Sequence, residues 1–444
     1  MLWEQTPRIR ITPPGPQAKK VLALDKRYIS PSYTRAYPLV AKKGSGMIVE
    51  DVDGNRYLDF TAGVAVCTTG HCHPEVVEAI QKQCAELIHM IGTDFYYPHQ
   101  ALVAEKLAEI TPGKFPKKVF LANTGAESVE AALKLSRFYT RRPRFIAYIS
   151  CFHGRTMGAL SLTSSKIVQR RYYAPLLSEV THIPYPYCYR CLFNLAYPKC
   201  QFACLKYLTD VLFTKVVPPE EVAAIVIEPI QGEGGYVVPP DGYLKELRKI
   251  CDKFHILFVA DEVQSGMGRT GKMFALEHWG VVPDIVCIAK GIASGMPLSA
   301  MVSRAELQTW PAGAHANTFG GNPVACAAAM KTIELLERGL IANAARTGAY
   351  LMKRLNALKN KYDFIGDVRG KGLMLGVEIV RDRKSKTRDP EHRNNIVQWC
   401  FRHGLIIMGC GENSIRFSPP LIITNDDVDK GLEIFTRALK TVKR

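Results

Sequence analysis

Residues 256–292, ILFVADEVQSGMGRTGKMFALEHWGVVPDIVCIAKGI, contain two short apolar segments that are each followed by polar side chains. The segments Ile256–Ala260 and Ile285–Ala289 have the length and composition of buried strands. Asp261 follows the first segment, and Lys290 follows the second. Ligand sites of open parallel sheets lie at the carboxyl ends of the strands. The stretch therefore predicts a site in which a carboxylate and a lysine amine act at one edge of a sheet.

The composition is that of a soluble globular protein. The chain has 444 residues, of which 47% are hydrophobic and 22% are charged, and this length predicts two or three domains. Its apolar segments are shorter than the roughly 20 residues that span a membrane. Its polar, proline-rich N-terminus lacks the apolar segment of a secretory signal. We therefore expect a cytoplasmic protein that contacts no membrane.

The net charge of +17 raises the alternative of a nucleic-acid-binding protein, because clustered cations bind phosphate backbones. The basic residues cluster at 141–144, 166–171 and 381–388. The sequence has no nucleic-acid-binding signature, and aromatic residues do not alternate with these charges. The clusters are typical of helix ends and loops around a site for acidic ligands, so we expect no nucleic-acid partner.

Four of the 13 cysteines lie close together in the segment YCYRCLFNLAYPKCQFAC. Cys188 and Cys191 form a CxxC pair, and Cys200 and Cys204 form a CxxxC pair. Such pairs bind zinc or, less often, an iron–sulfur cluster, although the two pairs are closer together than in a zinc ribbon. Two disulfides and simple packing are open alternatives, because cysteine also acts as a small buried hydrophobe.

The order of predicted elements indicates an α/β fold. Residues 1–60 form an N-terminal arm, without sustained periodicity up to residue 45, and a hairpin that belongs to a smaller domain. Residues 61–322 alternate strands with helices, which predicts a large domain with a mostly parallel sheet. Residues 323–444 complete the smaller α+β domain. Further predicted strands are 118–122, 145–149, 222–227 and 373–379, and predicted helices are 75–90, 98–110, 126–139, 243–254, 324–336, 341–360, 391–403 and 425–442.

The segment LANTGAE connects a predicted strand to a predicted helix through small residues. The backbone N–H groups of Thr124, Gly125 and Ala126 would lie at the helix N-terminus, with the Thr124 hydroxyl beside them. A helix N-terminus of this kind binds phosphate and other anions. The segment by itself is more typical of a plain capped helix start, so its interpretation as an anion site depends on the other segments.

Two other predicted strand ends carry groups that suit the same edge of the sheet. SCFHGRT places Phe152 near Arg155, which offers a stacking face and a bidentate clamp for a carboxylate. EPIQGEGG contributes Glu228 and Glu233. Paired acids also occur in glycosidases and metal sites, but no companion motif supports either function here.

The glycines of GMGRTG formally match a dinucleotide fingerprint, which makes an NAD-binding dehydrogenase the alternative from a different class. In that fingerprint the glycines directly follow a strand, whereas DEVQS separates them from the strand here. A lysine that forms a Schiff base with pyridoxal 5′-phosphate (PLP) needs a carboxylate on the pyridine nitrogen. It also needs a phosphate site, an aromatic face and a clamp for the substrate carboxylate. The chain supplies one candidate for each.

NTGAES, FHGRT, EPIQGEGG, DEVQSGMGRTG, the lysine of AKGI and NTFGGNP, in this order, resemble the class III (ω-amino-acid) aminotransferases from about residue 40 to the C-terminus. The similarity is greatest to 4-aminobutyrate aminotransferases, then to acetylornithine and ornithine aminotransferases. Some relatives are amino-acid racemases or epimerases. The resemblance implies a fold-type I PLP-dependent transferase that moves an amino group from an ω-amino acid to 2-oxoglutarate by a ping-pong mechanism.

The resemblance also implies how PLP is held. Lys290 would form the Schiff base and carry the proton, Asp261 would pair with the pyridine nitrogen, and Gln264 with the ring hydroxyl. Phe152 would stack on one face of the ring and Val263 would contact the other.

The remaining implied roles concern the phosphate, the partner subunit and the substrate. Gly125 and Ala126 would bind the phosphate together with the partner subunit's Thr318, so the family pattern predicts a homodimer or larger oligomer with shared active sites. The implied substrate residues are Arg155 for a carboxylate, the switchable ion pair of Glu233 and Arg416, and Val64 in the pocket wall.

Overall fold

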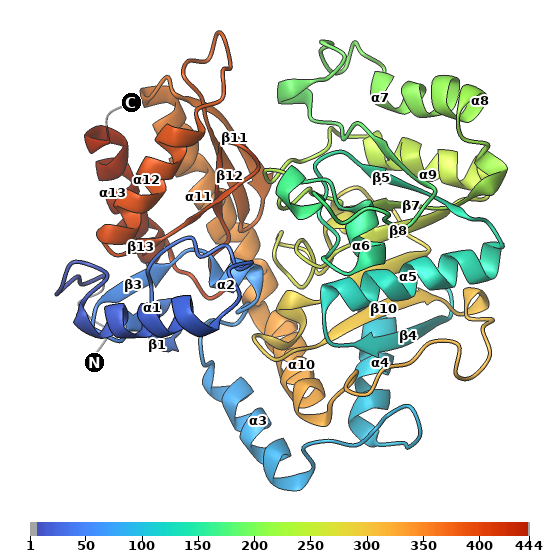
Figure 1. Ribbon diagram of the computed structural model, residues 1–444, viewed down its shortest axis with the longest axis horizontal. Coiled ribbons are helices and arrows are strands. Elements are labelled where there is room, and N and C mark those ends of the chain that lie inside the picture. The colour runs from blue at the N-terminus through green and yellow to red at the C-terminus, as the bar shows by residue number, and fades with distance from the viewer. Residues whose placement is uncertain (1–6, 443–444) are drawn as a thin grey trace.

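The computed structural model describes residues 7–442, and its central element is a seven-stranded sheet (Figure 1). The strand order is β4-β10-β9-β8-β7-β5-β6. Strands β9, β8, β7, β5 and β6 pair in parallel with one another, whereas β10 is antiparallel to β4 and β9. The predicted mostly parallel sheet is therefore confirmed. The strands are β4 (Lys117–Ala122), β5 (Arg144–Tyr148), β6 (Val180–Ile183), β7 (Val222–Ile227), β8 (Leu257–Asp261), β9 (Ile285–Ile288) and β10 (Ser299–Arg304).

The central strands of this sheet are covered by protein on both faces. Every residue of β7 and β8 is buried, which explains why these segments are continuous apolar runs rather than alternating ones. Helix α5 (Gly125–Thr140) packs against β9 and β10, and α9 (Tyr243–Phe254) packs against β8. Helix α5 begins with a reciprocal capping box between Thr124 and Glu127.

Of two smaller sheets, the first joins segments from both ends of the chain. In the first, β3 of the N-terminal hairpin pairs in parallel with β13, so Leu58 lies opposite Leu405. Figure 1 accordingly shows the N-terminal strands beside the C-terminal helices α12 and α13. The first sheet contains β1 (Ala41–Ser45), β2 (Ile48–Asp51), β3 (Arg56–Asp59) and β13 (Leu405–Ile406), and the second contains β11 (Ile365–Lys371), β12 (Met374–Ile379), β15 (Ser414–Phe417) and β14 (Met408–Cys410).

Each predicted helix is present to within four residues at either end, whereas the helical segments at residues 16–28 and 203–215 were not predicted. None of the helices in the described range is long and apolar enough to span a membrane. The remaining helices are α2 (Ala62–Ala65), α3 (Pro74–Glu86), α4 (Pro98–Ile110), α6 (Met157–Leu162), α7 (Ala203–Lys206), α8 (Phe213–Lys215), α10 (Pro323–Leu335), α11 (Ile341–Lys361), α12 (Pro390–Arg402) and α13 (Asn425–Thr441).

The N-terminal arm differs from its prediction, because residues Pro16–Tyr28 form helix α1. Its first N–H groups are capped from outside the helix. The carboxylate of Asp53 accepts hydrogen bonds from the N–H groups of Gln17 at 2.8 Å and Ala18 at 2.9 Å. A cap that lies in the hairpin cannot be recognised from the local sequence, and this explains why the helix was not predicted.

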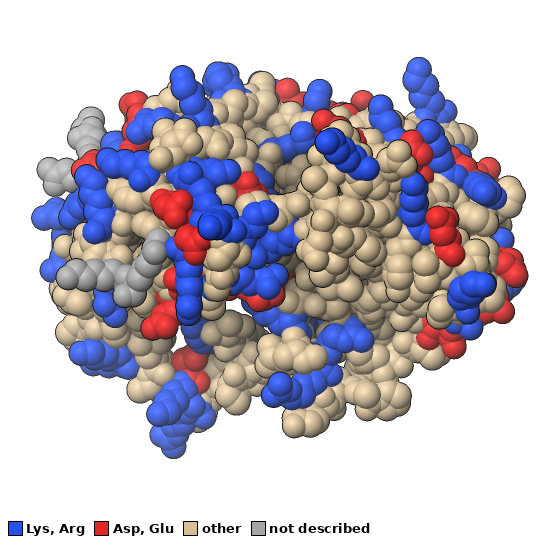
Figure 2. Space-filling view, turned by 90° about the horizontal axis from the view of Figure 1, so that it is seen from above, with Lys and Arg blue, Asp and Glu red and all other residues tan. Residues whose placement is uncertain are grey.

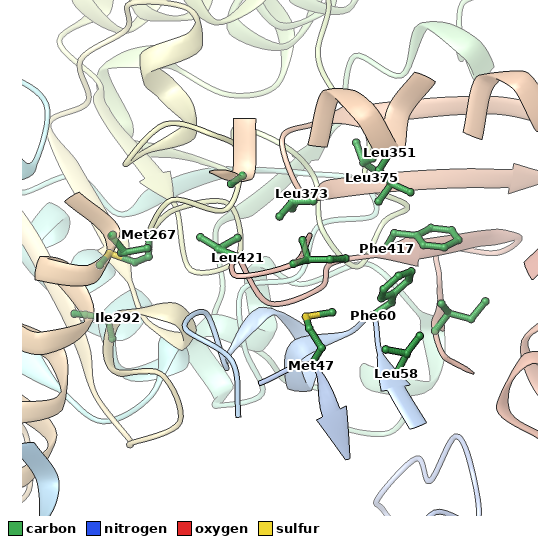
Figure 3. Close-up of a cluster of buried hydrophobic side chains, with 14 of the residues drawn as sticks. Met47, Leu58, Phe60, Met267, Ile292, Leu351, Leu373, Leu375, Phe417 and Leu421 are labelled. Carbon is green, nitrogen blue, oxygen red and sulfur yellow. The ribbon is translucent and has the colours of Figure 1, made fainter. Parts of the chain in front are cut away.

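One buried apolar cluster connects the small sheets to the large one (Figure 3). Phe60 of the N-terminal segment packs near Phe417 of β15, with ring centroids 6.3 Å apart. The same cluster includes Met267 and Ile292, which follow the two strands that carry Asp261 and Lys290. The core therefore fixes the loops at the carboxyl edge of the large sheet against both ends of the chain.

Candidate active site

Asp261 and Lys290 lie together at the carboxyl ends of neighbouring parallel strands. Asp261 is the last residue of β8, and Lys290 closely follows β9. The two strands pair directly, with Asp261 opposite Cys287. Both Asp261 and Lys290 line a cleft of about 480 Å³. Six other residues with predicted roles line the same cleft: Gly125, Ala126, Phe152, Arg155, Val263 and Gln264.

The carboxylate of Asp261 is held by two hydrogen bonds. One oxygen is 2.7 Å from Nδ1 of His153, and the other accepts from the N–H of Val263 at 3.0 Å. Burial opposes protonation of His153, but the neighbouring Cys151 and Asp261 raise its pKa well above the ordinary value. A protonated His153 donates to Asp261 and thereby orients this carboxylate. The sequence analysis gave His153 no role, although its position beside Phe152 after β5 was a usable signal.

The Lys290 amine is more easily deprotonated than that of an exposed lysine. Burial lowers the pKa of Lys290, and the Asp261 carboxylate opposes this shift in part. The backbone of Lys290 has a φ of 47°, in a region that side chains other than glycine seldom adopt. A buried lysine with a lowered pKa is suited to accept and return a proton near neutral pH.

The N-terminus of α5 forms one wall of the cleft and is in close contact with Val263. A Cβ on Gly125 would lie 2.9 Å from a methyl group of Val263, so glycine is required by this close approach. The N–H of Thr124 donates to the Glu127 carboxylate at 2.7 Å. This N–H is therefore not available to an anion, contrary to the prediction, whereas Gly125 and Ala126 still line the cleft.

Glu228 lines the cleft and orients the loop that carries Phe152. Its carboxylate accepts from the N–H groups of Phe152 at 3.1 Å and Gly232 at 3.0 Å. Burial raises the pKa of Glu228 to about 7. The guanidinium of Arg155 lies 5.6 Å from the centre of the Phe152 ring, so the stacking and carboxylate-binding candidates are neighbours.

The residues of the cleft fit PLP. Lys290 supplies the amine, Asp261 an oriented carboxylate, and α5 a helix N-terminus for a phosphate. The side-chain oxygen of Gln264 is buried and has no hydrogen-bond partner within the described part of the chain. A buried amide oxygen without a partner is costly, and a hydroxyl group of a bound ring would supply the missing donor.

Glu233 and Arg416 form the ion pair that the resemblance implied. Nη1 of Arg416 is 3.1 Å from Oε2 of Glu233, and Arg416 is only 5% exposed. The other carboxylate oxygen of Glu233 is 2.6 Å from Nζ of Lys166, a contact that the sequence analysis did not predict. After burial and Asp261, the charges of Arg416 and Glu233 also affect the pKa of Lys290. Neither Glu233 nor Arg416 is among the described residues that line the cleft around this amine.

Val64 and Thr318 do not line the cleft, as far as the described residues define it. Val64 lies in α2, where residues 62–65 all have positive φ and form a left-handed turn. Val66, just beyond this turn, lines the cleft instead. Thr318 is exposed on the segment between β10 and α10, and its contribution to the partner's phosphate site stays a prediction.

The four neighbouring cysteines line a separate, small cavity of about 20 Å³. All four are free thiols, and burial raises the pKa of Cys204 to about 12. Residues 7–442 contain no group of three or more His, Cys, Asp or Glu side chains arranged to hold a metal ion. This arrangement fits the packing interpretation, while zinc binding stays a prediction.

Basic side chains are numerous on one face of the molecule. Figure 2 shows one face of the molecule on which Lys and Arg gather around a hollow between the two halves, with fewer Asp and Glu among them. This distribution agrees with the net charge of +17. Such a field attracts acidic small molecules.

Fold and site together define the class of the protein: it is a fold-type I PLP-dependent enzyme. The chain belongs to the class III aminotransferase family, because the family model for "Aminotransferase class-III" matches residues 28–439. Enzymes of this family depend on PLP and act on an amino donor and an oxo acid. This chain is accordingly a PLP-dependent transaminase, and the NAD-binding alternative is discarded.

Individual relatives point to more than one activity. The chain is 43% identical to an alanine/serine racemase of Pyrococcus horikoshii, over 98% of this chain and 93% of the relative. It is 39% identical to a 4-aminobutyrate aminotransferase of Mycobacterium leprae, over 98% of both chains. Among solved structures it resembles an amine transaminase of an uncultivated Pseudomonas species in its PLP-bound form, with a TM-score of 0.86 and 32% identity over 94% of this chain and 98% of that one.

Proposed function

We propose that this transaminase moves the amino group of an ω-amino acid such as 4-aminobutyrate to 2-oxoglutarate. The observation that carries the proposal is the ion pair of Glu233 with the buried Arg416, because the charges of both residues also act on the pKa of Lys290. An arginine that a carboxylate can mask suits an enzyme whose two substrates differ in their number of carboxylates. The similarity to a 4-aminobutyrate aminotransferase supports this choice of donor.

In this proposal the cofactor side of the cleft consists of Asp261, Lys290 and His153. Lys290 and Asp261 hold PLP at its reactive end and its ring nitrogen, and His153 keeps Asp261 oriented. The other groups that hold PLP are Gly125, Ala126, Phe152, Val263 and Gln264. When bound, PLP supplies an electron-accepting ring that stabilises negative charge on the substrate carbon.

The chain's own contribution to the chemistry is proton transfer and orientation. The Lys290 amine, whose pKa is lowered by burial, removes a proton from the substrate carbon and returns it to a neighbouring position. Arg155 binds the carboxylate that both substrates carry at the end of the chain away from the reacting carbon. Arg416 binds the second carboxylate of the 2-oxo acid and is paired with Glu233 when the ω-amino donor is bound.

A homodimer with shared active sites is also part of the proposal. An apolar cleft lined by Ile88 and Phe319 is continuous with the active-site cleft, since Asn123, Met296 and Pro297 line both. Ile88 is 63% exposed and Phe319 is 60% exposed. A second copy that covers this surface would bury both side chains and bring Thr318 near the partner's phosphate site.

The test is to supply the PLP-loaded enzyme with one amino donor at a time and no oxo acid. We expect 4-aminobutyrate to be deaminated once per active site, with kcat/KM at least about tenfold above that of ornithine or acetylornithine. Adding 2-oxoglutarate should then yield glutamate. If the enzyme prefers ornithine or acetylornithine, the proposed donor is wrong, but the assignment as a transaminase still holds.

An amino-acid racemase is the second candidate, because the chain is 43% identical to an alanine/serine racemase over nearly its whole length. A racemase needs no oxo acid and returns the proton to the opposite face of the same carbon. Incubation with L-alanine, L-serine or L-leucine alone, followed by chiral chromatography, distinguishes the two. Formation of the D-isomer without amino transfer would favour the racemase.

A further inference from the structure

Glu233 is shared between two cations that differ strongly in exposure. Its oxygen Oε2 is 3.1 Å from Nη1 of Arg416, and its oxygen Oε1 is 2.6 Å from Nζ of Lys166. The Arg416 side chain is 6% exposed, whereas that of Lys166 is 43% exposed. Each cation uses a different carboxylate oxygen, so neither contact has to break for the other to persist.

Arg416 has unused capacity for a second carboxylate. Its Nε is buried and has no hydrogen-bond partner in the range 7–442. A guanidinium has five N–H donors and binds carboxylates through two of them at once. When Arg416 turns toward a substrate carboxylate, Glu233 loses some or all of this partner, and a mostly buried carboxylate without a partner is strongly destabilised.

We propose that Lys166 is a positioning residue that keeps Glu233 paired while Arg416 binds the second carboxylate of the 2-oxo acid. Lys166 therefore sets the affinity for dicarboxylates relative to monocarboxylates. The inference rests on the proposed function, because it takes Arg416 to be the group that distinguishes the two substrates. Charge also supports it: although burial raises the pKa of Glu233, Arg416 and then Lys166 lower it below the ordinary value.

The competing explanation is a surface ion pair that has no connection with the substrate. Exposed pairs contribute little and are screened by salt. Such a pair would have the same small effect on every ligand. The proposal instead requires an effect on dicarboxylates alone, so ligand selectivity separates the two explanations.

The test measures binding of glutarate and butyrate to the PLP-loaded enzyme by calorimetry, in the wild type and in Lys166→Met. We expect Lys166→Met to weaken glutarate binding about fivefold and to leave butyrate binding unchanged. Lys166→Arg, which keeps the charge, should restore most of the glutarate affinity. The matched control is Lys331→Met on α10, which removes a comparable pair with Glu334 at 2.5 Å and should change neither ligand.

A double-mutant cycle with Glu233→Gln completes the test. If Lys166 acts through Glu233, Lys166→Met should have no effect on glutarate binding in the Glu233→Gln background. Unchanged glutarate binding in Lys166→Met, equal weakening of both acids, or persistence of the effect without Glu233 would overturn the proposal. A wild type that binds glutarate but forms no glutamate from 2-oxoglutarate would instead contradict the proposed function and leave the result for Lys166 standing.

Discussion

The cofactor side of the cleft and its substrate side, which we define as Glu233, Arg416 and Lys166, are held in different ways. Asp261 and Lys290 follow neighbouring parallel strands of one sheet, and the pairing of β8 with β9 fixes their separation. Arg416 instead lies on β15 of a small sheet, while Glu233 follows β7 of the large one. The substrate side therefore depends on how the two sheets pack against each other, whereas the cofactor side depends on pairing within one sheet.

The largest expected effect is at Lys290, which should serve both half-reactions because it belongs to the cofactor side. Lys290→Ala should lower kcat by about 10³-fold or more in both half-reactions, because the group that carries the proton is lost. The two half-reactions are measured separately, with donor alone and with 2-oxo acid alone. Lys272→Ala, a change at an exposed lysine, is the control. A loss confined to one half-reaction would remove Lys290 from the shared cofactor side.

Asp261→Asn should also affect both half-reactions equally, with a decrease in kcat of about 10²- to 10³-fold. The substitution removes the charge that His153 orients and leaves the volume of the side chain unchanged. Stopped-flow measurement of each half-reaction gives the two rates. A fall in only the 2-oxo acid reaction would place Asp261 on the substrate side.

Arg416→Gln should act selectively. Without the guanidinium, the KM for 2-oxoglutarate should rise about 10- to 100-fold, while the KM for 4-aminobutyrate should change little, because only the first substrate needs this group. Steady-state kinetics with each substrate varied in turn measure both values. Equal increases in the two KM values would show that Arg416 serves both substrates, and the distinction between a cofactor side and a selective substrate side would then fail.

The smallest expected effect concerns the stability of the cofactor side. Burial raises the pKa of Glu262 from 4.5 to about 7, so the contribution of this group to stability is greatest at low pH and falls as the pH rises from about 4.5 to 7. Glu262→Gln cannot ionise, and its stability relative to wild type should rise by about 3 kcal/mol across that window. Thermal unfolding at several pH values tests this, with Glu433→Gln at an exposed position of α13 as control. Parallel pH profiles for wild type and Glu262→Gln would contradict the prediction.

The cofactor side was largely predictable from the sequence, because each of its residues follows a short apolar strand. Asp261, Lys290, Phe152 and Gln264 all lie where that pattern placed them. The antiparallel strand β10 was not predicted. Its short segment, SAMVSR, has neither a continuous apolar run nor a clear alternation of apolar and polar residues.

The substrate side was accessible only through the resemblance to a family. Glu233 and Arg416 are far apart in the chain, and their contact depends on the packing of separate sheets. The contacts of Lys166 with Glu233 and of His153 with Asp261 are likewise tertiary. Helix α1 shows the same limit for local structure, because its cap comes from Asp53 in the hairpin.

Tracing of ¹⁵N from labelled 4-aminobutyrate in the presence of 2-oxoglutarate tests the central claim most directly. The account predicts that the PLP-loaded wild-type enzyme transfers the label to glutamate, and that Arg416→Gln does so only at much higher concentrations of 2-oxoglutarate. Absence of labelled glutamate from the wild type, together with racemisation of alanine or leucine under the same conditions, would contradict it.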